Sequence, residues 1–307
     1  MEQKELLAEA HAAERSPCPV TSDYCAMNKH SFACLTLLLG LATACQPRQT
    51  TETNDAVAAA TVYSASAAHS FQTQTLQRQS ERCSGDSCAR ISIQTVVAQG
   101  GPAPLRDSLN QYVHTYLLRQ QLTTNPDADI HRPGNAAELV AAQFLKEYAT
   151  FQQENEGRGA SLGWELTIAS QPIYQTGAFV SLRLNSTGYL GGAHGFNVTT
   201  LQSFDSTGRA LRLREMVTDT VQLRKLTERE FRRVRQLPNT SFEEQGFFTQ
   251  GQGLPFTENV ALTAQGLLMY YNAYEVNAYA FGPTELLLPY AQLQGLLKSA
   301  YLPRARP

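Results

Sequence analysis

The sequence has no surplus of positive charge, since 25 Lys and Arg residues stand against 27 Asp and Glu residues. Nucleic-acid binding requires a basic surface, so we expect no nucleic-acid partner. The apolar run from Phe32 to Leu41 is shorter than the roughly 20 residues that a membrane-spanning helix needs. We therefore expect no retained transmembrane helix.

The usual metal-binding and hydrolase motifs are also missing. The chain contains no Gly-x-Ser-x-Gly elbow and no His-Glu-x-x-His sequence. No two of the histidines beyond residue 45 have the spacing of two or four residues that is typical of a metal-ligand pair; they are His69, His114, His131 and His194. We expect no metal, no cofactor and no catalytic residue.

The N-terminal part has the pattern of an exported, lipid-anchored protein. Residues 27–44 combine a short basic start, an apolar run and small residues, which is typical of a signal peptide. Their end resembles a bacterial lipoprotein signal, which predicts lipidation of Cys45 and a place in the cell envelope, on the outer membrane or periplasmic side. Cleavage by an ordinary signal peptidase stays open, because Ala42 stands where such signals usually carry leucine. Residues 1–26 fit a translation start placed too early, and residues 45–70, rich in Thr, Ala, Gln and Ser, predict a flexible tether.

Two cysteines follow the tether. Cys83 and Cys88 flank a short Gly-Asp turn, and this spacing predicts a disulfide that closes a hairpin in an oxidising compartment. A zinc or redox pair is the alternative, although the chain offers no second pair of ligands and the spacing is not Cys-x-x-Cys.

The alternation and periodicity of apolar residues predict an α+β fold with mixed, mainly antiparallel sheets and packed helices. The expected order is β-β-α-α-β-β-β-β-α-β-β-β-α, which does not alternate strictly and so argues against a doubly wound sheet. Residues 163–217 are expected to form an antiparallel meander of four strands, and a last helix is expected to begin near Pro289.

The segment GYLGGAHGF is the first candidate functional stretch. An enzyme would use His194 as a base, but that requires a carboxylate, nucleophile or further ligands beside it. Gly191, Gly192 and Gly195 instead predict a turn between two strands, with at least one of them at positive φ. We favour the turn, and keep a binding role for His194 as the second interpretation.

A tyrosine-rich segment is the second candidate. Tyr271 and Tyr274, with Glu275 beside them, could bind a sugar ring or a protein partner if they are exposed. On a continuous strand, Tyr270 and Tyr274 would share one face, and Tyr271 and Tyr279 the other. Core packing with hydroxyls at the sheet edge is the alternative, and by general frequency the more common outcome.

Two segments, GGAHGFNVTTLQSFDSTGRALRLREMV and LMYYNAYEVNAYAFGPTELLLPYAQL, resemble the exported domain of unknown function at the C-terminus of the anti-sigma factor RsiV. That domain also accompanies the peptidoglycan deacetylase PdaC and occurs alone in bacterial lipoproteins. The resemblance covers residues 188–307, and residues 71–187 are similar to the partner domain that precedes it. It implies an α+β fold outside the cytoplasm and, from RsiV, binding of lysozyme. This sequence does not contain the membrane-spanning helix or the cytosolic sigma-binding segment of RsiV. It also does not contain the metal-binding catalytic domain of the deacetylase.

Together these observations predict a non-catalytic, lipid-anchored binding module of the cell envelope, with lysozyme or peptidoglycan as the ligand. The alternative is an envelope hydrolase that acts on peptidoglycan.

Overall fold

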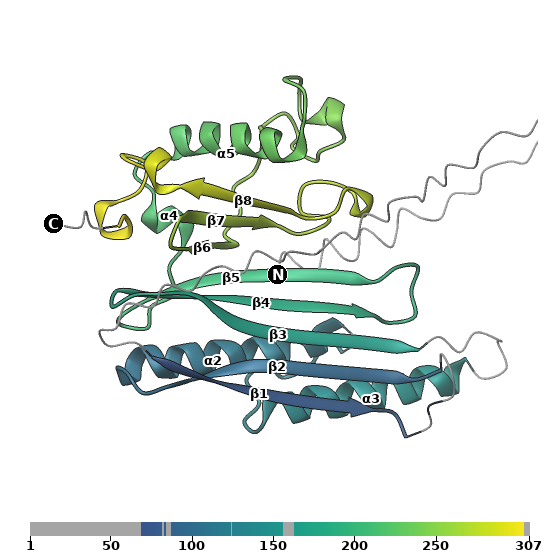
Figure 1. Ribbon diagram of the computed structural model, residues 1–307. Helices are drawn as coiled ribbons and strands as arrows, with labels where there is room; N and C mark the ends of the chain where they lie inside the picture. Colours follow the sequence, from purple (N-terminus) through teal and green to yellow (C-terminus); the bar gives the residue numbers. More distant parts are fainter. Residues whose placement is uncertain (1–68, 82, 84–86, 124, 156–162, 304–307) are drawn as a thin grey trace, which may run out of the picture. The chain divides into compact units, whose positions relative to one another are not determined.

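The computed structural model describes residues 69–81, 83, 87–123, 125–155 and 163–303, all within the compact unit formed by residues 56–307. Its first part is a five-stranded sheet in the order β1-β2-β3-β4-β5 (Figure 1). The strands are β1 (Ser70–Gln79), β2 (Ala89–Gln99), β3 (Trp164–Gln175), β4 (Phe179–Tyr189) and β5 (Phe196–Asp205). All neighbours are antiparallel except β2 and β3, which run parallel.

Two helices explain the parallel pair. Helices α2 (Ala103–Arg119) and α3 (Ala136–Glu154) lie between β2 and β3 in the chain and carry it back to the end of the sheet where β2 began. Both pack on one face of the sheet (Figure 1), where their apolar stripes and the inward residues of the strands form the first core. The Asn135 side chain begins α3 by accepting the backbone N–H groups of Ala137 and Glu138.

The second part is a three-stranded antiparallel sheet of β6 (Val260–Leu262), β7 (Gly266–Tyr271) and β8 (Thr284–Pro289). It follows a single turn, α4 (Leu213–Met216), and helix α5 (Thr220–Arg235), which packs on the outer face of this sheet (Figure 1). Strand β7 is buried on both faces: Leu267, Met269 and Tyr271 enter the second core with α5, while Leu268 and Tyr270 face the first sheet. The predicted α+β class is confirmed by this arrangement.

The two sheets are joined by asparagine side chains along the outer edge of β5. Asn259 accepts the backbone N–H of Leu201 and donates to the carbonyl of Thr199, at 2.7 and 2.8 Å. Asn272 accepts the N–H of Thr199 at 2.8 Å and donates to its carbonyl at 3.1 Å. Backbone groups that a sheet edge would leave to solvent are thus bonded to the second part of the protein.

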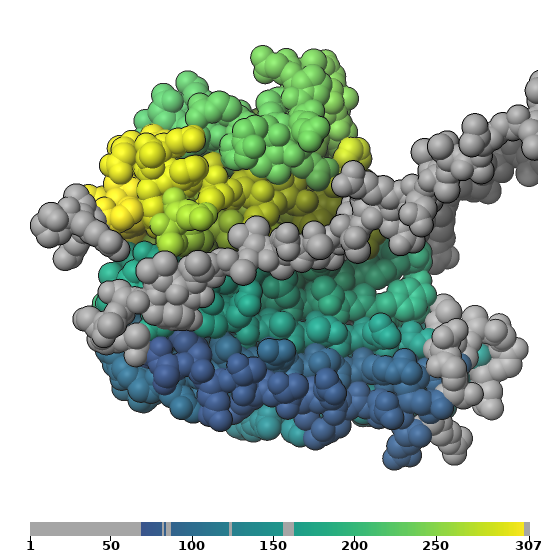
Figure 2. Space-filling model, viewed as in Figure 1, coloured from purple at the N-terminus to yellow at the C-terminus, as the bar shows by residue number. Residues whose placement is uncertain are grey.

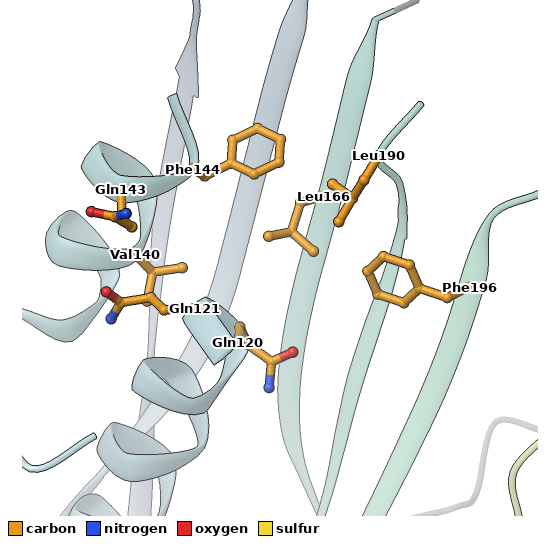
Figure 3. A pocket seen from close by; sticks show the side chains of 8 residues that line it. All are labelled: Gln120, Gln121, Val140, Gln143, Phe144, Leu166, Leu190 and Phe196. Carbon is orange, nitrogen blue, oxygen red and sulfur yellow. The ribbon is translucent and has the colours of Figure 1, made fainter. Parts of the chain in front are cut away.

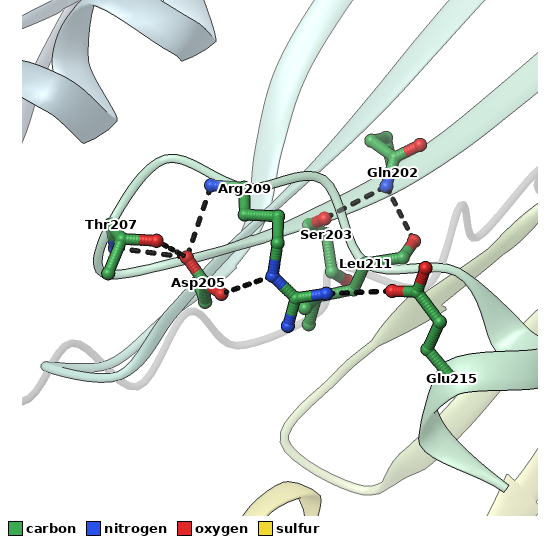
Figure 4. Close-up of polar contacts among 7 residues, drawn as sticks. All are labelled: Gln202, Ser203, Asp205, Thr207, Arg209, Leu211 and Glu215. Atoms are coloured by element: carbon green, nitrogen blue, oxygen red, sulfur yellow. Dashed lines mark hydrogen bonds and ion pairs between the residues drawn. The ribbon is translucent and has the colours of Figure 1, made fainter.

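The predicted strand at residues 210–217 is wrong. Asp205 closes a tight turn by accepting hydrogen bonds from Thr207 and Arg209, and the Arg209 guanidinium also bonds Glu215 (Figure 4). After one bridge to β5 at Ala210, the alternating apolar residues pass into the second core and the chain turns into α4. Burial alone would raise the pKa of the Asp205 carboxyl, but its hydrogen bonds outweigh this and hold the pKa below 3.8.

The predicted last helix is wrong as well. Between β8 and residue 303 the chain forms two 3₁₀ turns, at Tyr290–Gln292 and Ser299–Tyr301, and Gly295 between them has a φ of 76°, which an α-helix does not accommodate. The expected division at residue 188 falls inside β4, and β5 pairs with β4. The change from the first sheet to the second therefore comes after Asp205. No helix in the described ranges is long and apolar enough to cross a membrane.

Candidate functional site

The glycine-rich segment forms the turn between β4 and β5, and backbone conformation or a close contact accounts for two of its glycines. Gly191 has a φ of 79°, and a Cβ there would lie 3.1 Å from Trp164 Nε1. A Cβ on Gly195 would lie 2.8 Å from the carbonyl oxygen of Gly188, whereas one on Gly192 would meet nothing within 4 Å. Two of the three predicted turn glycines are thus required by conformation or space, and the turn is fixed by its packing.

This turn presents His194 to a loop far away in sequence. His194 Nδ1 lies 2.8 Å from the carbonyl oxygen of Gly195, and Nε2 lies 3.2 Å from the Tyr274 hydroxyl. The imidazole stacks on the ring of Tyr279 with 3.8 Å between centroids and 16° between planes. The Tyr274 and Tyr279 rings are 5.7 Å apart. We call these three residues, His194, Tyr274 and Tyr279, the His–Tyr cluster.

The hydrogen bonds define the tautomer of the neutral imidazole. A backbone carbonyl only accepts, so Nδ1 of His194 carries the proton in its bond to Gly195. In the neutral ring Nε2 is then the acceptor, and the Tyr274 hydroxyl donates to it. Each bond orients the ring, and the Tyr279 stack holds its plane. The cluster is therefore a pre-arranged surface that needs little reordering to bind a flat ligand face.

The cluster is exposed and one member has an unusual backbone. Tyr274 and Tyr279 retain 49% and 36% of their accessible surface, and His194 is exposed. Tyr274 has a φ of 69°, a left-handed conformation that costs a residue with a side chain about 1–2 kcal/mol. This backbone conformation presents the Tyr274 ring to His194.

The tyrosine-rich segment is not one strand. Strand β7 ends at Tyr271, and Asn272 turns away to bond β5 and the Glu275 carboxylate. The next residues form the β7–β8 loop, which includes a 3₁₀ turn at Tyr279–Phe281. The expected sharing of one strand face by Tyr270 and Tyr274 is therefore wrong.

Tyr271, predicted as a binding candidate, is a core residue. It is 1% exposed, packs edge-on against Phe231 at 5.6 Å and donates its hydroxyl to the Pro255 carbonyl at 2.9 Å. Its side chain follows β7 toward α5, opposite to the first sheet, and burial raises the pKa of its hydroxyl. Loss of hydration raises the pKa of the Glu275 carboxyl, partly offset by the Asn272 hydrogen bond. Glu275 thus supports the loop that carries Tyr274.

Two exposed aromatic rings were missed from the sequence. Phe281, 44% exposed, ends the 3₁₀ turn that carries Tyr279, and its ring lies 5.9 Å from that of Phe247. Phe248, 57% exposed, donates its backbone N–H to the carbonyl of Val276 in the same loop region. The segment AYAF contained a signal for Phe281, since two aromatic residues spaced by one small residue are hard to bury in a short loop. No pattern in the sequence linked Phe248 to Phe281 or to the tyrosines of the loop.

The cavities near the turn do not provide a ligand pocket. One enclosed cavity of about 10 Å³ lies between the helices and the turn (Figure 3), which is enough space for about one water molecule. Three glutamines and five apolar residues line it: Gln120, Gln121, Gln143, Val140, Phe144, Leu166, Leu190 and Phe196. A wider, open depression of about 700 Å³ lies over one end of β1, β2 and β3, and its lining contains no aromatic side chain. The cavity beside the turn is therefore too small for a ligand larger than a water molecule.

The hydrogen-bond partners of His194 can be compared with those that a catalytic histidine requires. Its bonded partners are a backbone carbonyl and a tyrosine hydroxyl, so the orienting carboxylate of a His-based dyad is not among them. Within the described ranges, no group of three or more His, Cys, Asp and Glu residues is placed to hold a metal ion. What the geometry offers is a rigid, exposed aromatic surface with hydrogen-bonding groups at its rim.

The structure joins Cys83 and Cys88 in a disulfide next to β2. Cys83 is exposed and Cys88 is fully buried. Cys45, the predicted lipidation site, lies outside the described residues, as do the predicted signal peptide and tether up to residue 68.

Comparison with known proteins finds similarity to one family of proteins. Residues 216–291 match the family described as "Protein of unknown function (DUF3298)". A DUF3298 member from Bacteroides fragilis has the same fold with 23% identity and a TM-score of 0.62, over 76% of this chain and 95% of that one. A DUF3298 protein from Pseudomonas aeruginosa has 20% identity and a TM-score of 0.55, over 78% and 98% of the two chains. Comparison with curated proteins gives no match. The resemblance to a domain of unknown function is therefore confirmed.

Proposed function

We propose that this protein is a non-catalytic binding module of the bacterial cell envelope, anchored through a lipid on Cys45, and that its binding site is the His–Tyr cluster. The observation that carries the proposal is the exposed, interlocked arrangement of His194, Tyr274 and Tyr279. Aromatic rings held rigidly at a surface supply large contact areas at low entropic cost, and tyrosine is enriched among residues that dominate binding energies.

The chemistry of the cluster suits an envelope glycan or a protein that binds one. A sugar ring presents an apolar face that stacks on a tyrosine ring, while its hydroxyls bond to groups at the ring edge. The Tyr279 hydroxyl and the outer faces of both tyrosine rings can serve these roles, and the nearby Glu275 carboxylate adds an acceptor. Phe281 and Phe248 extend the apolar area for a protein such as lysozyme.

The experiment is a binding titration of the purified chain with soluble peptidoglycan fragments and, separately, with lysozyme. Tyr274→Ala and Tyr279→Ala should each weaken binding at least fivefold, since truncation of a central aromatic contact typically costs more than 1 kcal/mol. Val221→Ala is the matched control, because Val221 is 62% exposed on α5 and belongs to a different surface.

Three results would contradict the proposal. Unchanged binding in both tyrosine variants would place the site elsewhere, and absence of binding to either ligand would remove the proposed ligand class. Turnover of peptidoglycan that is lost in a folded His194→Ala variant would favour the hydrolase instead.

A further inference from the structure

We propose that the free edge of β1 pairs with β1 of a second copy of this chain, which forms an antiparallel, two-fold symmetric dimer with one continuous ten-stranded sheet. The inference begins with a contrast between the two edges of the five-stranded sheet. It concerns assembly and is independent of the ligand proposed for the His–Tyr cluster.

The edge at β5 is bonded to the rest of the protein. Its outward backbone groups are taken by Asn259 and Asn272 at Thr199 and Leu201. Farther along β5, the Ser203 carbonyl accepts the N–H of Leu211 at 2.8 Å. An edge that is bonded in this way cannot add another strand.

The edge at β1 is different. Ser80 donates its backbone N–H to the Ala89 carbonyl at 3.0 Å, which makes Ser80 and Ala89 a hydrogen-bonded pair. Because such pairs alternate along the unbroken β1–β2 register, the odd-numbered residues from Phe71 to Gln79 point their N–H and C=O groups away from β2. Among the described residues, the partner found for these outward groups is the Arg78 side chain, which donates to the Gln77 carbonyl.

Natural proteins protect exposed edge strands with lysines, prolines, inward charges or bulges. Strand β1, SFQTQTLQRQ, has ten residues, no proline, no lysine, no acid and no shift in register. Its side chains are mostly exposed, and its one charge, Arg78, is paired with Glu138 of α3 at 2.6 Å. A long, regular, unprotected edge is a template for strand addition.

The geometry of β1 favours a second copy over an unrelated strand. Outward groups belong to odd residues, so the antiparallel register with the greatest overlap places the two-fold axis at Thr75. Thr73 then lies opposite Gln77 of the second copy, and Arg78 lies opposite Gln72. No like charges face each other, and the outward N–H and C=O groups of the five odd residues bond to the second copy, with the Gln77 carbonyl also accepting from Arg78 through its other lone pair.

Helix α3 fits the same arrangement. It contacts both β1 and β2, and its Glu138 is paired with Arg78 of β1. Because the proposed two-fold axis is perpendicular to the sheet, the two copies of α3 would lie on the same face of the joined sheet, on either side of the axis. The flank of α3 on the Glu138 side carries Ala142 and Ala149, both exposed, whose small side chains allow this approach. Dark blue atoms of β1 lie at the surface in Figure 2.

The test is cross-linking of the purified full chain under mild oxidation, read out by mass spectrometry of the linked peptides. Thr75→Cys places two thiols across the two-fold axis, where paired Cα atoms lie about 5.5 Å apart, within the range for a disulfide. Gln77→Cys is the matched control on the same edge, because its two copies would lie about 14 Å apart along the strands. A link between two copies of residue 75 and none between copies of residue 77 is expected.

Sedimentation of the unmodified chain should show a concentration-dependent dimer. Thr75→Lys places two like charges directly opposite each other and should raise the dimer dissociation constant about fivefold or more, without affecting the melting temperature of the monomer. A chain that stays monomeric, equal linking at positions 75 and 77, or a dimer that Thr75→Lys leaves unchanged would overturn the proposal. A monomer would also be the result if a peptide or the chain's own N-terminal segment occupied this edge.

Discussion

Replacement of Tyr274 by glycine separates the role of its ring from the cost of its backbone. Tyr274 has a φ of 69° and is 49% exposed, so its side chain contributes little buried area to the fold. Glycine removes a left-handed penalty of about 1–2 kcal/mol but adds about 0.5–1 kcal/mol of chain entropy to the unfolded state. Loss of the exposed hydrogen bond to His194 costs about 0.5 kcal/mol. These opposing terms leave the unfolding free energy within about 1 kcal/mol of its original value.

The assay combines urea or thermal unfolding with the binding titration. We expect the melting temperature of Tyr274→Gly to stay within about 4 °C of the unmodified chain, while binding weakens at least fivefold. Tyr274→Ala removes the same ring but keeps the strained backbone, so it should be less stable than Tyr274→Gly by about 1 kcal/mol and bind equally weakly.

Gln236→Gly is the matched control for the backbone change. Gln236 has a φ of 53° at the C-terminal end of α5, and it is exposed and belongs to a different element. Its replacement should be neutral or slightly stabilising and leave binding unchanged. The reasoning is refuted if Tyr274→Gly loses several kcal/mol of stability, which would make the ring a folding determinant, or if it binds as tightly as the unmodified chain.

Four further predictions address other parts of the protein. Cys45→Ser should abolish incorporation of a clickable fatty acid in cells, and label retained in this variant would exclude lipidation there. Cys83→Ser should lower the unfolding free energy by about 2 kcal/mol, because the closed loop is short, and a reductant should have no effect on this variant. Asp205→Asn should cost about 1 kcal/mol at neutral pH; since the folded pKa is lowered, this stabilisation is present above the ordinary aspartate pKa and is lost as the pH falls through the lower folded pKa, so the variant should show a weaker acid dependence. Gly191→Ala should cost about 1–2 kcal/mol in urea unfolding, and Gly192→Ala, with free space around its Cβ, less than about 0.5 kcal/mol.

Local patterns predicted most of the elements. The three- and four-residue spacing of apolar residues identified α2, α3 and α5, and Asn135 marked the start of α3. Alternation identified β3, β4 and β5 together with their antiparallel meander. In these segments local preference and burial agree, so the sequence alone is informative.

Long-range contacts were less predictable. The parallel pairing of β2 with β3 depends on the crossover through two helices, which alternation within a strand does not reveal. Residues 210–217 alternate because Leu211 and Leu213 enter the second core from a loop, so the period of two was present without a strand. The alternation in this segment reflects the burial of leucine side chains in the second core and not strand pairing.

The candidate site was predictable in its parts but not as a unit. His194 and Tyr274 were both singled out, yet they are 80 residues apart and their contact depends on how the two sheets join. The apolar run of β7 continued the period-two pattern to its end at Tyr271, so a longer strand was the simplest expectation. The chain leaves the strand at Asn272, whose amide bonds the backbone of Thr199 on β5.

Asn272 is therefore the residue that couples the fold to the site. Its side chain bonds both backbone groups of Thr199, and its amide also donates to Glu275 at 2.9 Å. Thr199 lies five residues beyond His194 on β5, and Glu275 directly follows Tyr274. One amide thus fixes the position of the two loops that carry the cluster. If this half-buried amide moved away, the buried backbone N–H of Thr199 would lose its partner, which costs about 1–3 kcal/mol. The rigidity that a preorganised binding surface requires comes here from the junction between the sheets, and the aromatic rings themselves remain free to meet a ligand.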